Sequence, residues 1–179
     1  MEKNKCNILI REAGSDDAKL LCALQTVTFY EAYFEQDSPE DMANYLHEMF
    51  NPERVRLELE DKDASFYVMC RDGVAVGYAK LVRHSRADGV SQGRTVELKR
   101  IYLVERVWRQ GLGQALLDHC IGVAMGEGFE SLWLGVWERN ERAKGFYLKN
   151  GFERVGTIEF PYGDTVGINW VMEKRLYSI

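Results

Sequence analysis

Apolar residues in the first 60 positions recur at the three- and four-residue spacing of amphipathic helices. A short expected strand over residues 7–11 precedes Ser15-Asp16-Asp17, which predicts a capped helix with acidic residues in its first turn. Two further start signals, Ser38-Pro39-Glu40-Asp41 and Asn51-Pro52-Glu53, predict helices from residue 39 to about 50 and from 52 to about 59. The apolar positions of the first helix are Leu20, Leu21, Leu24 and Val27.

The pattern changes to that of strands at residue 64. The segments ASFYVMCR and VAVGYAKLVR flank Asp72-Gly73, a dipeptide that favours a tight hairpin. After the loop RADGVSQGR, the segment TVELKRIYLV over residues 95–104 is expected to be a strand. Alternation along it puts Val96, Leu98 and Arg100 on one face and Glu97, Lys99 and Ile101 on the other.

The last third of the chain alternates helix and strand signals. A helix is expected over residues 112–125, followed by the apolar strand ESLWLGVW and a short helix that Asn140 caps and Gly151 closes. FERVGTIEF and VGINWVMEK then predict an antiparallel pair around Pro161-Tyr162-Gly163-Asp164. The order of elements predicts an α/β protein with a mixed sheet, parallel where a helix joins consecutive strands.

Composition excludes several classes of protein. The 179 residues are 46% hydrophobic with three prolines, which predicts one domain over residues 1–179. No apolar run approaches the roughly 18 residues of a membrane span, and the first residues lack a secretory pattern, so we expect a cytoplasmic protein with no membrane partner. The four cysteines and three histidines stand apart without ligand spacing, which argues against a metal site or a disulfide framework.

Charge is distributed unevenly along the chain. Residues 31–63 contain 11 acidic and three basic residues, whereas residues 64–179 contain 16 basic and 13 acidic residues. This asymmetry indicates one partner of each sign, although solvated helix faces explain much of it. The net charge of −5 disfavours nucleic acid as a partner.

The stretch WRQGLGQALL, residues 108–117, connects an expected strand to an expected helix. Its two glycines allow a tight turn and expose amide N–H groups at the positive end of a helix dipole, where phosphate binds readily. The dinucleotide pattern G-x-G-x-x-G fails because Leu116 replaces the third glycine, and no G-x-x-x-x-G-K-[ST] sequence occurs. For a G-x-G taken alone, a sharp turn without any ligand is the alternative.

A second block accompanies this loop. VELKRIYLVERVWRQGLGQALL and LWLGVWERNERAKGFYLKNGF together resemble the GNAT superfamily of acyl-CoA-dependent N-acetyltransferases, whose pyrophosphate loop reads [QR]-x-x-G-x-[GA]. In that loop Gly111 and Gly113 match, but Trp108 stands where Gln or Arg is usual, with Arg109 as the neighbouring source of charge. The family's N-x-x-A-x-x-F-Y-x-x-x-G-F block matches at Asn140, Ala143, Phe146, Tyr147, Gly151 and Phe152. The chain looks closest to bacterial polyamine N-acetyltransferases of the PaiA type, which share ELxRIYL, LWLGVWExN and an ending like VMEKRL.

The resemblance implies a mixed, mainly antiparallel sheet with a parallel central pair at the coenzyme A cleft and flanking helices. It implies acetyl-CoA as cosubstrate and no metal. The implied cofactor-binding residues are Ile101, Tyr102 and Leu103 for pantetheine, Arg109, Gln110, Gly111, Leu112, Gly113 and Gln114 for pyrophosphate, and Asn140, Lys144 and Tyr147. A plain helix cap is the alternative for Asn140, and a lysine that reaches only water is the alternative for Lys144.

Acetyl transfer from a thioester needs a neutral amine, stabilisation of an oxyanion and a proton for the leaving thiolate. Tyr147 holds the position of the family's general acid, and a phenol, with an ordinary pKa of about 10, suits donation to a thiolate. A core tyrosine is the alternative. Glu97 is the candidate base, with Glu138 as a second candidate and an exposed strand glutamate as the alternative.

The acidic region and nearby aromatic residues favour a cationic acceptor. The candidate acceptor-binding residues are Tyr30, Glu31, Tyr33, Phe34 and Trp137, with further acidic charge from Glu35, Asp37 and Glu40. The resemblance therefore implies acetyl transfer to a small primary amine, such as spermidine or spermine, by direct attack in a ternary complex. The alternatives are a peptide or protein amine, an aminoglycoside, or a non-catalytic acyl-CoA-binding sensor, and a homodimer is left open.

Overall fold

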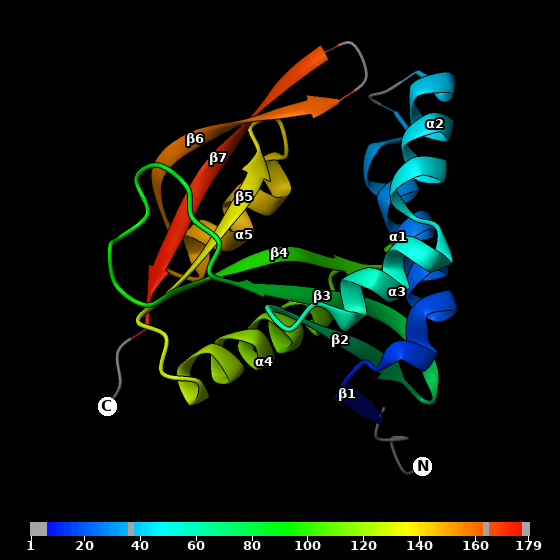
Figure 1. Ribbon diagram of the computed structural model, residues 1–179, viewed down its shortest axis with the longest axis horizontal. Coiled ribbons are helices and arrows are strands. Elements are labelled where there is room, and N and C mark those ends of the chain that lie inside the picture. Colours follow the sequence, from blue (N-terminus) through cyan, green and yellow to red (C-terminus); the bar gives the residue numbers. More distant parts are fainter. Residues whose placement is uncertain (1–6, 36–37, 163–164, 177–179) are drawn as a thin grey trace. The chain divides into compact units, whose positions relative to one another are not determined.

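The structure is a computed structural model that describes residues 7–35, 38–162 and 165–176 (Figure 1). Its strands are β1 (Ile8–Glu12), β2 (Ala64–Arg71), β3 (Val74–Arg83), β4 (Thr95–Leu103), β5 (Ser131–Trp137), β6 (Glu153–Tyr162) and β7 (Thr165–Arg175). Its α-helices are α1 (Ala18–Tyr33), α2 (Pro39–Met49), α3 (Pro52–Glu60), α4 (Leu112–Gly126) and α5 (Glu141–Lys149), with short 3-10 helices η1 (Ser15–Asp17) and η2 (Glu105–Val107). Each expected strand and helix has its counterpart within a few residues.

The strands follow the order β1-β2-β3-β4-β5-β7-β6 in a seven-stranded sheet. β4 and β5 are parallel, with Thr95–Glu97 opposite Ser131–Trp133, whereas β1 with β2, β5 with β7 and β6 with β7 are antiparallel. These pairings confirm the mixed sheet with a parallel central pair. β7 lies between β5 and β6, so the helix that joins those two strands does not make them neighbours.

The chain forms two compact units that are interleaved in the sequence. Unit 1 contains Met1–Lys80 and Arg100–His119, and unit 2 contains Leu81–Lys99 and Cys120–Ile179. β4 and α4 contribute residues to both units. The expectation of a single domain over residues 1–179 stays a prediction.

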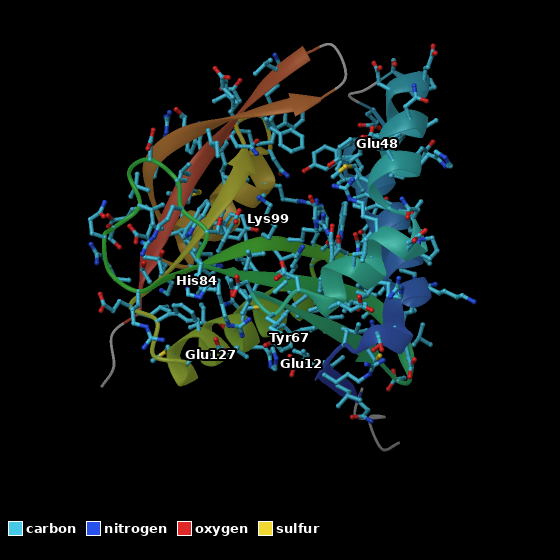
Figure 2. All side chains as sticks on the ribbon, in the orientation of Figure 1. Glu12, Glu48, Tyr67, His84, Lys99 and Glu127 are labelled. Carbon is cyan, nitrogen blue, oxygen red and sulfur yellow. The ribbon has the colours of Figure 1, made fainter. Side chains whose placement is uncertain are left out.

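In unit 1, helices cover both faces of the strands. Arg100 on β4 contacts Gln25 of α1 and Glu58 of α3, so these two helices cover one face. Tyr67 on β2 (Figure 2) makes an edge contact with His119 of α4, which covers the other face. The hairpin between β2 and β3 turns through Asp72 and Gly73, whose φ angles of 50° and 80° are those of the expected tight turn.

The buried face of α1 includes only part of its apolar positions. Leu21 and Leu24 are buried, whereas Leu20 and Val27 are 36% and 46% exposed. The buried residues Leu21, Leu24, Gln25, Thr28 and Phe29 form a regular i, i+3, i+4, i+7, i+8 stripe. Two of them are polar, which is why apolar positions alone did not reveal this face.

Caps set the other helix starts. Ser38 Oγ accepts a hydrogen bond from the Asp41 amide at 3.1 Å, and Asn51 Oδ1 accepts one from the Arg54 amide at 2.9 Å, as the cap signals predicted. Ser15 is not a cap, because Gly14 holds that position at the start of η1.

In unit 2, the long loop after β3 and helix α5 cover opposite faces of β5, β7 and β6. Val90 of the loop packs against Trp133 of β5 and Val171 of β7. Trp170 precedes Val171 on β7. The Lys144 ammonium of α5 lies over the Trp170 ring, 4.2 Å from the centroid. Successive strand residues point to opposite faces, so the loop and α5 are on different sides. Gly163 and Asp164 of the expected turn between β6 and β7 lie outside the described residues.

Candidate functional site

The connection from β4 to α4 in unit 1 contains two residues in the left-handed backbone region. Arg109 has a φ of 61° and Gly111 a φ of 81°. The Gly111 carbonyl accepts the first helical hydrogen bond, from the Ala115 amide at 3.1 Å, which makes Gly111 the residue before the helix. The first amides of α4 have no partner within the helix, and its dipole makes this end positive. The turn therefore offers an anion a set of amide donors.

The expected pyrophosphate residues at this turn are mostly open to solvent. Arg109, Gln110, Gly111 and Gln114 are exposed, and a β carbon built at Gly111 would meet nothing within 4 Å. At Gly113 a β carbon would make only an ordinary contact, 3.7 Å from Leu103 Cδ1. The two glycines therefore leave the end of the helix bare for a ligand, and only Gly111 is demanded by the backbone angle. These observations fit a bound pyrophosphate.

Side chains of the protein hold this turn in place. Gln110 Nε2 donates to the Arg106 carbonyl at 3.0 Å, and its side-chain oxygen accepts from Arg71. The indole N–H of Trp108 donates to the Leu103 carbonyl at 2.8 Å. Gln114 donates to Asp118 at 2.8 Å. Leu112 is buried and anchors the start of α4 in the core.

The expected pantetheine strand, Ile101–Leu103, is half-buried at the end of β4. The Tyr102 hydroxyl lies 3.4 Å from the Tyr33 hydroxyl of α1. Burial and the neighbouring Tyr33 raise the pKa of Tyr102 well above its ordinary value, so its phenol stays protonated. Tyr33 therefore belongs to the packed side of α1.

The other acceptor candidates on α1 have different surroundings. Tyr30 and Phe34 are 51% and 48% exposed and stack on each other, with ring centroids 5.6 Å apart. Glu31 accepts a hydrogen bond from the Glu105 amide at 2.8 Å, so its carboxylate caps η2. Glu35 and Glu40 are exposed, and Asp37 lies outside the described residues. The end of α1 thus brings Tyr33 to β4 and leaves the Tyr30 and Phe34 pair in solvent.

A buried cluster of charged groups in unit 1 was missed from the sequence. Glu58 of α3 accepts from Arg100 at 2.7 and 3.2 Å and from Lys80 of β3 at 2.9 Å. Arg100 also donates to Gln25 Oε1 at 3.1 Å. Burial alone would raise the pKa of Glu58, but the positive charges and hydrogen bonds of Arg100 and Lys80 outweigh it and hold that pKa below its ordinary value. The sequence signals were Lys80 within a mostly apolar strand and Arg100 on the same strand face as Val96 and Leu98.

The candidate base Glu97 lies in unit 2, on the part of β4 that pairs with β5. It is 4% exposed, so the alternative of an exposed strand glutamate is wrong. Its carboxylate accepts from the Ser85 hydroxyl at 2.6 Å and from the Lys99 ammonium at 3.1 Å. Lys99 itself is exposed and projects from β4 (Figure 2). Glu97 is thus a buried acceptor with a hydroxyl and a cation at its two oxygens.

The matched block around α5 also lies in unit 2. Asn140 Oδ1 accepts from the Ala143 amide at 3.0 Å and caps α5, which confirms the cap, and Gly151 ends the helix with a φ of 79°. Tyr147 is buried, with its ring edge-on to Phe146 and Phe152. Lys144 does not merely reach water: it is 6% exposed and donates to the Glu138 carbonyl and, at 2.6 Å, to Glu141. Trp137 is half-buried, with the Arg139 guanidinium 5.9 Å from its ring centroid.

No group of three or more His, Cys, Asp or Glu side chains in residues 7–35, 38–162 and 165–176 is arranged to hold a metal ion. None of the described helices is long and apolar enough to cross a membrane.

Comparison with known proteins gives one consistent answer. Residues 24–152 match the model of the acetyltransferase (GNAT) family. An uncharacterized N-acetyltransferase of Lactobacillus delbrueckii subsp. lactis is 30% identical over 94% of this chain and 98% of its own length. One from Mycobacterium tuberculosis is 32% identical over 89% of this chain and 98% of its own.

Solved structures share the fold. A PaiA N-acetyltransferase of Thermoplasma acidophilum, solved in complex with coenzyme A, has a TM-score of 0.76 and 24% identity, covering 94% of this chain and 99% of its own. A GNAT acetyltransferase of Streptococcus pneumoniae has a TM-score of 0.71 and 25% identity, covering 96% and 100%. The family match spans the turn before α4, the parallel pair and the block around α5, and on this evidence the chain belongs to the GNAT acetyltransferase family.

Proposed function

We propose that this protein is an acetyl-CoA-dependent N-acetyltransferase that acetylates a primary amine, with a small polyamine such as spermidine or spermine as the acceptor. The observation that carries the proposal is the turn before α4, where left-handed Arg109 and Gly111 leave the first amides of the helix open to an anion. Because the chain belongs to the acetyltransferase family, we infer that the anion bound there is the pyrophosphate of coenzyme A. The solved relative that contains coenzyme A supports the same cofactor.

The cofactor would be held by two parts of unit 1. Amides of the turn from Arg109 to Gln114 would bind its pyrophosphate, with the Arg109 guanidinium adding charge. Backbone groups of Ile101–Leu103 would pair with its pantetheine amides and polarise the thioester carbonyl. When bound, acetyl-CoA supplies an acetyl group already activated as a thioester. Lys144 does not belong to this set, because its ammonium donates to the Glu138 backbone carbonyl and the Glu141 carboxylate.

Residues of unit 2 would move the protons. We assign Glu97 as the base that takes a proton from the acceptor ammonium, directly or through water, because an alkylamine is almost entirely protonated at neutral pH. Glu138 is the second candidate for that role. Tyr147 would return a proton to the leaving thiolate, and Asn140 would contact the pantetheine arm while it caps α5.

The acceptor assignment rests on charge and on exposed aromatic side chains. Net acidity over residues 31–63 and the exposed Tyr30 and Phe34 pair suit a polycation with methylene segments. In unit 2, Trp137 is the candidate for contact with the methylene segments of the acceptor. Glu31 already accepts from the Glu105 amide, so a cation there would have to share its carboxylate. We place the enzyme in the cytoplasm.

A panel of amines tests both levels of the proposal. The purified chain is incubated with acetyl-CoA and spermidine, spermine, an aminoglycoside or peptides with free amines, and products are identified by mass. A polyamine gaining one acetyl group, with release of coenzyme A, is the expected result. Faster acetylation of a peptide or an aminoglycoside would refute the polyamine acceptor alone. Tight coenzyme A binding with no product from any amine would instead support a sensor.

A further inference from the structure

The loop between β4 and α4 is fastened to the rest of unit 1 at several points. The Val104 amide donates to the Val76 carbonyl of β3 at 2.9 Å, and the Glu105 amide donates to Glu31 of α1 at 2.8 Å. The Trp108 indole then reaches back five residues to the Leu103 carbonyl. This last bond closes the loop onto the end of the strand from which it leaves.

The direction of the Leu103 carbonyl follows from the neighbouring bonds. Val104 directs its N–H to β3, and a β carbon at Gly77 of β3 would lie 2.5 Å from the Tyr102 carbonyl oxygen. Tyr102 and Val104 thus direct their polar groups toward β3. Because alternate residues of a strand direct their N–H and C=O groups to opposite sides, Ile101 and Leu103 direct theirs away from β3. The indole of Trp108 therefore occupies one carbonyl on the side that the proposed function gives to pantetheine.

We propose that Trp108 is a positioning residue for coenzyme A: its indole fixes the pyrophosphate loop to Leu103 and removes that carbonyl from the groups that can pair with pantetheine. This inference rests on the proposed function. It leaves the Leu103 N–H and the N–H and C=O of Ile101 as the pairing groups. An indole has a single N–H donor, and here that donor is used within the protein, so Trp108 gives no hydrogen bond to phosphate. The charge that Gln or Arg would bring at this position falls to Arg109.

The bond matters because a ligand site that is ordered beforehand loses less freedom on binding. The left-handed backbone at Arg109 is unfavourable for a residue with a side chain and persists only where its surroundings hold it. Trp108 and Gln110, the residues on either side, are the nearest such restraints, and Trp108 is the one that ties the loop to β4. Without its indole bond, the loop would have to be ordered by the cofactor, and coenzyme A would bind more weakly.

Trp108→Phe keeps an aromatic ring, smaller than the indole, and deletes the N–H. Binding of coenzyme A to the full chain is measured by calorimetry, and we expect the dissociation constant to rise about fivefold to tenfold, the equivalent of one hydrogen bond with some loop order. The KM for acetyl-CoA should rise by a similar factor, while kcat and the KM for the amine stay unchanged. A purely structural role of Trp108 would not raise the KM for acetyl-CoA while leaving kcat and the KM for the amine unchanged. Trp108→Gln, which restores the residue usual in the family, should recover most of the affinity.

Trp133→Phe is the matched control, since the Trp133 indole N–H has no hydrogen-bond partner among the described residues. An unchanged dissociation constant in Trp108→Phe, or one shifted no more than in Trp133→Phe, would overturn the inference while wild-type binding upholds the proposed function. Absence of coenzyme A binding by the wild type would overturn both. If Trp108→Phe does not fold, proton exchange of the assigned Trp108 indole is measured by NMR in the ligand-free chain. Slow exchange is expected, and exchange as fast as that of an exposed indole would overturn the inference.

Discussion

Glu58→Gln should destabilise the protein far more than the same substitution on the exposed face of its short helix. The side chains of Glu58, Arg100 and Lys80 are 17%, 15% and 10% exposed, so their charges are largely removed from water. Removing one partner from a buried ion pair costs about 3–5 kcal/mol because the other charge is left uncompensated. Glutamine keeps the shape and one acceptor oxygen, so we expect about 3 kcal/mol. Against a typical total of about 5–15 kcal/mol, this is a large fraction.

The effect should depend on pH in a defined direction. The pKa of Glu58 is lower in the folded protein than its ordinary value of 4.5, so its ionised form stabilises the fold above that value. This contribution is lost as the pH falls from 4.5 through the lowered pKa of the folded state. The difference between wild type and Glu58→Gln should therefore be largest at neutral pH and shrink on acidification.

Urea unfolding followed by circular dichroism measures both quantities. Glu60→Gln is the control on the same helix, because Glu60 is 49% exposed and its bond to Arg56 at 2.6 Å is a surface pair. Such a pair contributes about 0.5 kcal/mol or less. If Glu58→Gln were no less stable than Glu60→Gln, or if its deficit did not change between pH 7 and acid conditions, the reasoning about the buried cluster would be refuted.

Three further outcomes are expected. Tyr147→Phe should lower kcat about 100-fold or more while calorimetry finds coenzyme A affinity unchanged, and full activity would remove Tyr147 from the proposed chemistry. Gly77→Ala should lower the free energy of unfolding in urea by about 2 kcal/mol or more, since the new β carbon would lie 2.5 Å from a backbone oxygen. Gly122→Ala, which has open space around it in α4, should raise that free energy by about 0.5–1 kcal/mol. Equal stabilities of the two variants would contradict both expectations. Gly111→Val should weaken coenzyme A binding at least about tenfold because its φ of 81° disfavours a branched side chain, and unaltered binding would undo the loop assignment.

Local signals in the sequence were sufficient for most of the elements. Ser38 and Asn51 fix helix starts through side-chain bonds to amides three residues on, and Asp72-Gly73 fixes a turn through backbone angles. Each depends on a few adjacent residues, so a short window contains the information. Local signals do not predict the buried face of α1. That face includes Gln25 and Thr28, whose burial depends on Arg100 and other residues distant in sequence.

In the candidate site, too, local motifs could be predicted from the sequence and contacts between distant residues could not. The turn at Gly111 and the cap at Asn140 were read from short motifs, because both are local backbone devices. The partners of Lys144 and Glu97 could not be predicted, since a lysine or glutamate in a helix or strand pattern does not reveal whether the fold will bury it. Trp108 was recognised as a departure from the family, but its bond to Leu103 requires the folded loop.

The position of β7 between β5 and β6 has a consequence for synthesis on the ribosome. β5 and β6 emerge before β7, yet the sheet order gives neither of them a neighbour on that side until β7 follows. Until β7 has left the ribosome, β5, with its buried Leu132 and Leu134, is an open apolar edge. Such edges attract other chains, so slow release of the last hairpin should favour aggregation, and its rapid pairing with β5 should suppress it.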